Sequence, residues 1–226
     1  MIYFVPTPVG NLQDITLRAL DLLKTCDFVF CEDWKISSNL YKLLEIEHKP
    51  TFVDLIRNGE LNYKIRETLT NNLEANICII TDAGTPGISD PGFEVVKICQ
   101  ELGLKYTVLP GATAFVPAIV ASGLVSKEFW YIGFLPLKKG RQALWKEIAN
   151  SKIPVILYES VHRIAKSIQE INQNLSPNAQ IFVGREISKK FESYYFGNPS
   201  EMTNKIQNLE IIQKGEFAIV IKNPKK

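Results

Sequence analysis

Short runs of apolar residues alternate along the first half of the chain with longer segments in which apolar residues recur at every third or fourth position. The short runs predict strands and the longer segments predict helices. Because the runs are apolar at nearly every position, they are typical of parallel strands that are buried on both faces. The predicted strands cover residues 2–5, 28–31, 51–53, 77–80 and 106–109, and the predicted helices start near residues 14–16 or cover residues 37–44, 60–73 and 93–102.

The pattern changes in the second half, where the predicted elements are shorter and alternate more between apolar and polar positions. This alternation is typical of a mixed sheet. We therefore expect an α/β protein with two α/β domains, residues 1–112 with a mainly parallel sheet and residues 113–226 with a mixed sheet. The predicted strands here cover residues 129–133, 155–158, 181–183, 193–196 and 216–221, and the predicted helices cover residues 114–121, 142–150, 164–174 and 199–209.

The stretch TDAGTPGISDPG, residues 81–92, directly follows one of the predicted buried strands. In open α/β sheets ligands bind at the carboxyl ends of the strands. Glycines let the backbone approach a ligand closely, and prolines stiffen the loop. Together with residues 7–12, this loop suits a nucleoside-bearing ligand, with Asp82 binding its hydroxyl groups or a cationic centre. The alternatives are an unusually long connection and an Asp82 that caps a helix or turn.

Two further groups of charged residues lie at the ends of predicted strands. Glu32 and Asp33 follow residues 28–31, where either carboxylate can act on a substrate hydroxyl as a general base or cap the next helix. Glu159 and His162 are the second candidates for a base, although a structural role for His162 is an open alternative.

Basic residues gather at the ends of two predicted strands in the second half. If these strands are neighbours, their ends form a basic surface that holds RNA phosphates. The alternative is an ordinary solvated rim of salt bridges. The residues concerned are Lys138, Lys139, Arg141, Arg163, Arg185, Lys189 and Lys190.

Composition narrows the functional classes. The chain has 226 residues, of which 46% are hydrophobic and 22% charged, and its net charge of +2 argues against a broad nucleic-acid-coating surface. The first half lacks a GxGxxG fingerprint and a GxxxxGK[ST] phosphate loop, which disfavours ordinary dinucleotide and P-loop sites. The four cysteines form no CxxC pair, so we expect reduced core thiols in a cytoplasmic protein and no metal site. No signal peptide or membrane-spanning run is evident.

A series of motifs carries a resemblance over nearly the whole chain. They resemble those of the tetrapyrrole-methylase-like (class III) S-adenosylmethionine-dependent methyltransferases, and among them the enzymes of small-subunit ribosomal RNA. In chain order the motifs are TPVGNLQDITLRAL from Thr7, CED from Cys31, DAGTPGISDPG from Asp82, LPG from Leu109, ASGL from Ala121, GFLP from Gly133, YESVHR from Tyr158, REISK from Arg185 and KGEF from Lys214.

The resemblance implies a homodimer that binds S-adenosylmethionine in the cleft between its two domains. It implies 2′-O-methylation of a cytidine ribose in the decoding region of 16S rRNA, with the donor loops in the first domain and RNA contacts in the second. The residues expected to bind the donor are carried over from the family's motifs or are glycines that let the backbone approach it closely. They are Pro8, Val9, Gly10, Asp82, Gly84, Thr85, Gly111, Thr113, Ala114, Phe134 and Leu135. The expected phosphate-binding residues are Lys35, Arg163, Arg185 and Lys189.

Trp34-Lys35 departs from the family's Thr-Arg at this point. Lysine keeps the charge but lacks the bidentate fork of arginine, so we expect the RNA contacts at this point to differ in detail from those of the family. Two rival functions are a small-molecule methylase of the same fold acting on a tetrapyrrole, and an RNA-binding or assembly factor that does not methylate.

Overall fold

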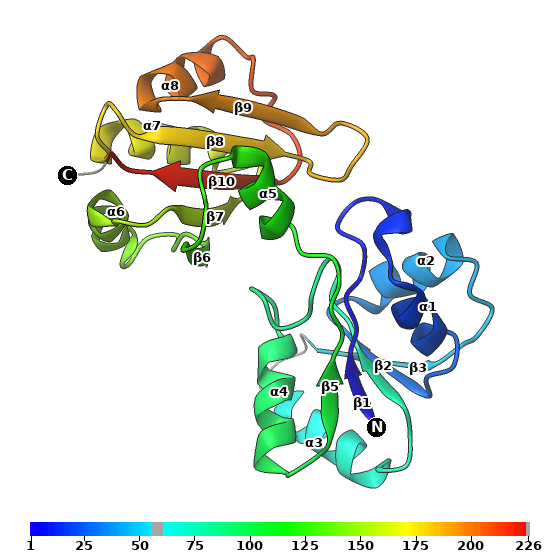
Figure 1. Cartoon of the computed structure of the whole chain (residues 1–226). Coiled ribbons are helices and arrows are strands. Elements are labelled where there is room, and N and C mark those ends of the chain that lie inside the picture. Colours follow the sequence, from blue (N-terminus) through cyan, green and yellow to red (C-terminus); the bar gives the residue numbers. More distant parts are fainter. Residues whose placement is uncertain (56–60, 225–226) are drawn as a thin grey trace. The chain divides into compact units, whose positions relative to one another are not determined.

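The apolar runs of the first half form one parallel sheet. The computed structural model describes residues 1–55 and 61–224. The strands stand in the order β3-β2-β4-β1-β5, and all neighbouring strands are parallel, as predicted (Figure 1). β1 therefore lies between β4 and β5. The strands are β1 (Ile2–Phe4), β2 (Phe28–Cys31), β3 (Thr51–Asp54), β4 (Ile77–Ile79) and β5 (Tyr106–Val108).

Helices cover both faces of this sheet. Ile77 and Ile79 of β4 pack with Val95 on one face, whereas Cys78 packs with Tyr41 on the other. Figure 1 shows α1 and α2 on one side of the strands and α3 and α4 on the other. Burial on both faces explains why the strands lack alternation. The helices are η1 (Leu12–Asp14), α1 (Leu17–Leu23), α2 (Trp34–Leu43), α3 (Leu61–Asn71) and α4 (Gly92–Glu101).

Helix α2 begins three residues earlier than the predicted start at Ser37. Asp33 is its N-cap, and the Asp33 carboxylate accepts a hydrogen bond from the Lys35 N–H at 2.7 Å. The predicted start followed apolar spacing, whereas the structure confirms the capping alternative for Asp33. The start of the helix predicted at Glu60 lies outside the described residues.

The second sheet is mixed, as predicted. Its order is β6-β7-β10-β8-β9, in which β6 and β7 are parallel and the other neighbouring pairs are antiparallel. β10 therefore separates β7 from β8. The strands are β6 (Trp130–Phe134), β7 (Val155–Glu159), β8 (Gln180–Arg185), β9 (Ser193–Gly197) and β10 (Phe217–Lys222).

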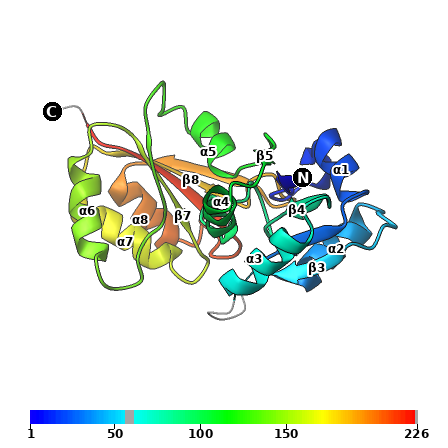
Figure 2. The same ribbon diagram turned by 90° about the horizontal axis from the view of Figure 1, so that it is seen from below.

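Helix α5 covers one face of the mixed sheet, and the remaining helices cover the other face (Figure 2). Ala118 of α5 packs with Ile156 and Val220, while Trp145, Ile168 and Met202 form the opposite core. The helices are α5 (Phe115–Ser122), α6 (Arg141–Asn150), α7 (Ile164–Asn174) and α8 (Pro199–Gln207).

The chain forms two compact units, unit 1 from Met1 to Thr113 and unit 2 from Ala114 to Lys226. The sequence placed the boundary between residues 112 and 113. All four cysteines are buried free thiols in unit 1. Within the described ranges, no helix is both long and apolar enough to span a bilayer.

Candidate functional site

The loops that follow β1, β4 and β5 meet at the carboxyl edge of the first sheet. Thr7 and Gly84 exchange two backbone hydrogen bonds of 2.9 and 3.0 Å, which form an isolated antiparallel bridge. The Thr7 hydroxyl also donates to the Thr81 carbonyl at 3.0 Å. On the other side, the Thr85 hydroxyl donates to the Ala112 carbonyl at 2.9 Å. The three loops therefore hold one another in place.

Two glycines permit this close approach of loop to loop. Gly84 has φ +89°, a left-handed conformation that favours glycine, although a Cβ there would make only ordinary contacts with the Ala112 carbonyl oxygen at 3.6 Å and Val9 Cγ2 at 3.8 Å. A Cβ on Gly111 would lie 2.5 Å from the Cβ of Pro6, which is closer than carbon atoms can pack. The sequence assigned these glycines to close contact with a ligand, and the structure shows that they first allow the loops to contact each other.

Asp90 organises the loop rather than facing a ligand. Its carboxylate accepts hydrogen bonds from the N–H groups of Gly87 at 2.7 Å, Ile88 at 3.0 Å and Gly92 at 2.7 Å. A side chain on Gly92 would lie 2.6 Å from the Gly87 nitrogen. The carboxylate thus folds the end of the loop back onto itself, immediately before α4 begins.

Asp82 and Glu32 are linked across the ends of β4 and β2. The Asp82 N–H donates to Glu32 Oε2 at 3.0 Å, and the Asp33 backbone hydrogen-bonds the Asp82 carboxyl. Asp82 does not cap α4, because the N-cap position of that helix is Pro91. Asp33, by contrast, takes the capping role that the sequence left open.

The pKa values of both acids are raised. Burial is the largest cause for Asp82, and the nearby charge of Asp33 adds to it, although the Asp33 backbone opposes the rise in pKa. Burial is also the largest cause for Glu32, whose pKa is further raised by the charges of Asp82 and Asp90 and lowered by the Asp82 N–H. Glu32 is thus a half-buried carboxyl with increased proton affinity beside the expected donor loop.

The lining of these loops fits a nucleoside-bearing ligand. The backbone N–H groups of Ala83, Thr85, Ala112 and Thr113 have no hydrogen-bond acceptor within the part of the chain that the structure describes. Pro8 and Val9 are half-buried and Gly10 is exposed, so this loop offers small and apolar surface. Backbone donors, apolar surface and the exposed Asp82 carboxylate together match the polar and apolar parts of a nucleoside.

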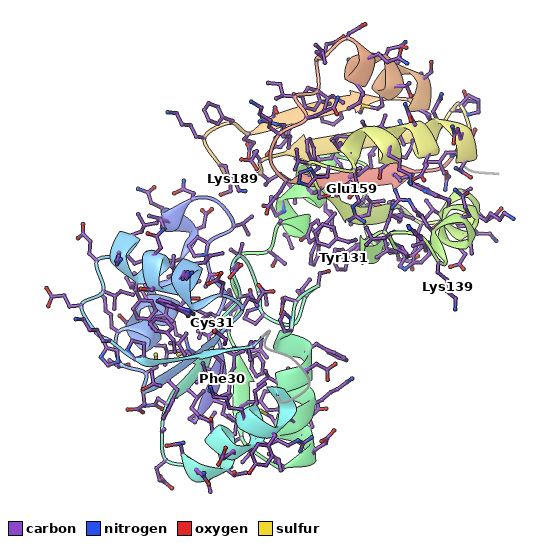
Figure 3. The ribbon with its side chains drawn as sticks, turned by 180° about the vertical axis from the view of Figure 1, so that it is seen from behind. Phe30, Cys31, Tyr131, Lys139, Glu159 and Lys189 are labelled. Carbon is purple, nitrogen blue, oxygen red and sulfur yellow. The ribbon has the colours of Figure 1, made fainter. Side chains whose placement is uncertain are left out.

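In unit 2 the structure overturns the expectation for Glu159. Its side chain is buried, and its carboxylate lies 2.8 Å from Arg163 Nε, 2.5 Å from the Ser167 hydroxyl and 3.9 Å from an Arg141 nitrogen. Both carboxylate oxygens are therefore occupied inside the unit. Figure 3 shows Glu159 among the strands of unit 2. Glu159 holds buried cations and is not placed to take a proton from a substrate.

The two arginines around Glu159 hold the loop that follows β6. Arg163 donates to the Leu135 carbonyl at 2.9 Å, and Arg141 donates to the Pro136 carbonyl at 3.0 Å. Arg141 is only 3% exposed, so its expected place on a basic surface is wrong. Glu170 completes this buried network, accepting from Arg141 at 2.6 Å and from the Trp145 indole at 3.0 Å.

The sequence missed Ser167 and Glu170 as members of this network. Their spacing of three residues on α7 places them on one helix face, and that face is buried. Burial, the largest influence on the pKa of Glu170, would raise it, but the hydrogen bonds from Arg141 and Trp145 outweigh burial and lower the pKa. The sequence signal that could have identified Ser167 and Glu170 is their position on the apolar face of this amphipathic helix.

Arg185 and Lys189 are also engaged inside unit 2. Arg185 is buried and donates to the carbonyls of Lys214 at 2.6 Å and Phe191 at 2.8 Å, so it holds two loops rather than phosphates. Lys189 bonds Glu186 at 3.1 Å and Glu216 at 2.9 Å. Burial alone would lower the pKa of Lys189, but the two carboxylates outweigh it and raise the pKa. β10 lies between β7 and β8, but Glu159 and Arg185 both pair with Phe217 of β10, so the ends of β7 and β8 lie at the same edge of the sheet. The basic side chains at these ends are engaged inside unit 2.

The remaining predicted residues vary in exposure. Leu135 is only 2% exposed and its side chain packs in the core, so it offers at most its backbone to a ligand. Phe134 is exposed, and its ring centroid lies 5.8 Å from Arg163 Cζ. Ala114 is half-buried at the start of α5. Figure 3 shows Lys139 pointing outward from unit 2. The exposed candidates are His162, Lys35, Lys138, Lys139 and Lys190.

A parallel sheet with ligand-type loops followed by a mixed sheet defines a class of two-unit α/β proteins, and sequence comparison identifies the family. The family described as Tetrapyrrole (Corrin/Porphyrin) Methylases matches residues 1–203. The chain belongs to this family.

Its relatives include two proteins named ribosomal RNA small subunit methyltransferase I. The protein of Campylobacter fetus subsp. fetus is 39% identical over 98% of this chain and 83% of its own length. The protein of Escherichia coli O157:H7 is 36% identical over 99% of this chain and 78% of its own length.

Solved structures share the fold. A cobalt precorrin-4 methyltransferase superposes with a TM-score of 0.69 at 17% identity, covering 98% of this chain and 94% of that chain. The uroporphyrin-III C-methyltransferase of Thermus thermophilus, complexed with S-adenyl homocysteine, has a TM-score of 0.65 at 16% identity, covering 97% of this chain and 96% of that chain.

The buried network predicts that Glu159→Gln destabilises the protein. The substitution keeps the volume of the side chain but leaves Arg163 without its carboxylate, which costs about 3 kcal/mol of unfolding free energy. Urea unfolding followed by tryptophan fluorescence measures the loss. The control is Glu210→Gln, which breaks an exposed pair with Lys205 and changes stability by less than about 0.5 kcal/mol. Equal losses in the two variants contradict the assignment.

Proposed function

We propose that this chain transfers a methyl group from S-adenosylmethionine to ribosomal RNA of the small subunit, at the 2′-oxygen of a cytidine ribose in the decoding region of 16S rRNA. The observation that carries the proposal is the meeting of three ligand-type loops beside Glu32 at one sheet edge. The full-length likeness to proteins named for small-subunit rRNA methylation supports the choice of substrate. By the same resemblance, we propose that it acts in the cytoplasm as a homodimer.

The donor site that we propose lies on the three loops of unit 1. Pro8, Val9 and Gly10 contact the donor from the β1 loop, and the unbonded N–H groups of Thr85 and Thr113 donate hydrogen bonds to it. Asp82 binds the donor's hydroxyl groups. When bound, S-adenosylmethionine supplies the methyl group, which is attached to a sulfonium that is a good leaving group. That Ala114, Phe134 and Leu135 of unit 2 also contact the donor stays a prediction.

Glu32 is the residue that we propose takes the proton of the ribose hydroxyl. Methyl transfer to oxygen requires alignment of that oxygen and removal of its proton as the bond forms. Glu32 lies beside Asp82, and its raised pKa brings it nearer to the value that suits a general base. Asp33 positions this corner by capping α2. The exposed Lys35, Lys138, Lys139 and Lys190 are the expected cations that remain for phosphates.

Transfer of tritium from labelled S-adenosylmethionine tests the activity. We expect label in 16S rRNA when 30S subunits lacking the modification are the acceptor, and nuclease digestion should release it as 2′-O-methylcytidine. Uroporphyrinogen is the acceptor that tests the tetrapyrrole rival. No label in rRNA contradicts the proposal, and label on a base contradicts its 2′-O part.

Asp82→Ala tests the donor pocket. Removal of a carboxylate that hydrogen-bonds a ligand hydroxyl should weaken S-adenosylmethionine binding at least about tenfold, which isothermal titration calorimetry measures. The control is Glu94→Ala, an exposed carboxylate on α4. Unchanged affinity in Asp82→Ala would place the donor elsewhere.

The raised pKa of Glu32 predicts the pH dependence of transfer. A base acts only when deprotonated, so the single-turnover rate should rise with pH through the raised pKa of Glu32 and level off above it. Glu32→Gln should lower the rate by about 10²-fold or more and remove this rise, because glutamine still accepts the Asp82 N–H but no proton. Asp33→Asn keeps an N-cap side chain, so this variant should retain both the rate and its rise with pH. A normal rate in Glu32→Gln excludes it as the base.

A further inference from the structure

Trp34 is the exposed tryptophan of this chain. Trp145 is fully buried and Trp130 is half-buried, whereas Trp34 is 43% exposed. Its indole N–H donates to no group in the part of the chain that the structure describes. A large flat side chain left in water, with an unused donor on its edge, is typical of a residue that contacts a partner.

The backbone under this ring is held firmly. The Trp34 N–H donates to Asp54 Oδ1 at 3.1 Å, which ties the start of α2 to the end of β3. Asp33 caps the same turn through the Lys35 N–H. Because the first turn of α2 is anchored at the ends of two neighbouring strands, the indole projects from a fixed base.

Trp34 follows the proposed base closely in the sequence. Trp34 comes two residues after Glu32, whose carboxylate accepts the Asp82 N–H at 3.0 Å. The ammonium of Lys35 is 6.0 Å from the Trp34 ring centroid, so a cation accompanies the aromatic face. The exposed ring, the cation and the half-buried carboxyl therefore all belong to residues that directly follow the carboxyl end of β2, within unit 1.

We propose that Trp34 is the stacking platform for a nucleobase of the RNA strand that carries the reacting ribose, with Lys35 contacting an adjacent phosphate. This inference rests on the proposed function and adds the residue that holds the substrate strand. RNA-binding proteins recognise unpaired nucleotides by stacking their bases on aromatic side chains. Stacking on Trp34 would hold such a nucleotide near Glu32 without requiring a broad basic surface.

A protein contact is the competing use of this surface. Ile36 is also exposed, at 47%, so the start of α2 could pack against a second copy of the chain. The charged and polar neighbours of Trp34, namely Asp33, Lys35 and Asp54, favour a polar ligand over an apolar protein interface. The two uses differ in what a Trp34 substitution changes.

Steady-state methyl transfer to 30S subunits tests the proposal in the full-length protein. Trp34→Ala should raise KM for the subunits about tenfold, in keeping with the loss of one base stack. The donor affinity measured by calorimetry should stay unchanged, because the ring is not part of the donor loops. Trp34→Phe keeps an aromatic face and should restore most of the loss.

Leu43→Ala is the matched control, since Leu43 is 55% exposed at the other end of the same helix. Wild-type kinetics in both Trp34→Ala and Leu43→Ala, or a Trp34→Ala that alters only the mass in solution, would overturn the stacking role. Absence of methyl transfer by the wild-type protein would instead reject the proposed function, so the two failures are distinguishable.

Discussion

The antiparallel bridge between Thr7 and Gly84 is the interaction on which the candidate site depends. Its two backbone hydrogen bonds join the loop after β1 to the loop after β4. Parallel strands end at one edge of a sheet, and their loops otherwise leave backbone groups unpaired there. By pairing with each other, the loops satisfy part of this requirement and keep a fixed separation. Among the described residues, the N–H groups of Ala83, Thr85, Ala112 and Thr113 belong to those that stay unpaired.

The order of the strands makes this bridge possible. β1 lies between β4 and β5, so its loop contacts both of the loops that come much later in the chain. β2 lies on the far side of β4, which brings Glu32 to Asp82. The site is therefore assembled from segments that are about 25 to 100 residues apart in sequence by one constraint, the neighbour relations within a single parallel sheet.

The strands and most helices could be predicted from the sequence, because burial on both faces produces apolar runs and amphipathic helices produce a clear period. The start of α2 could not be predicted, since an aspartate at this position is equally typical of a helix N-cap and of a catalytic carboxylate. The three loops were recognised by their glycines and prolines. The contacts between these loops were not predicted, because a glycine in a sequence indicates a close approach of the backbone but not which group approaches it.

The charged residues of unit 2 show where prediction from sequence failed and what this means for RNA binding. A buried charge requires a partner, so charges at strand ends pair with one another before they face a ligand. Glu159 lies between Arg141 and Arg163, and Arg185 is used by two loop carbonyls. Of the expected cations, Lys35, Lys138, Lys139 and Lys190 are the exposed ones. With a net charge of only +2, the RNA binding that we propose would depend on shape and base stacking as well as on charge.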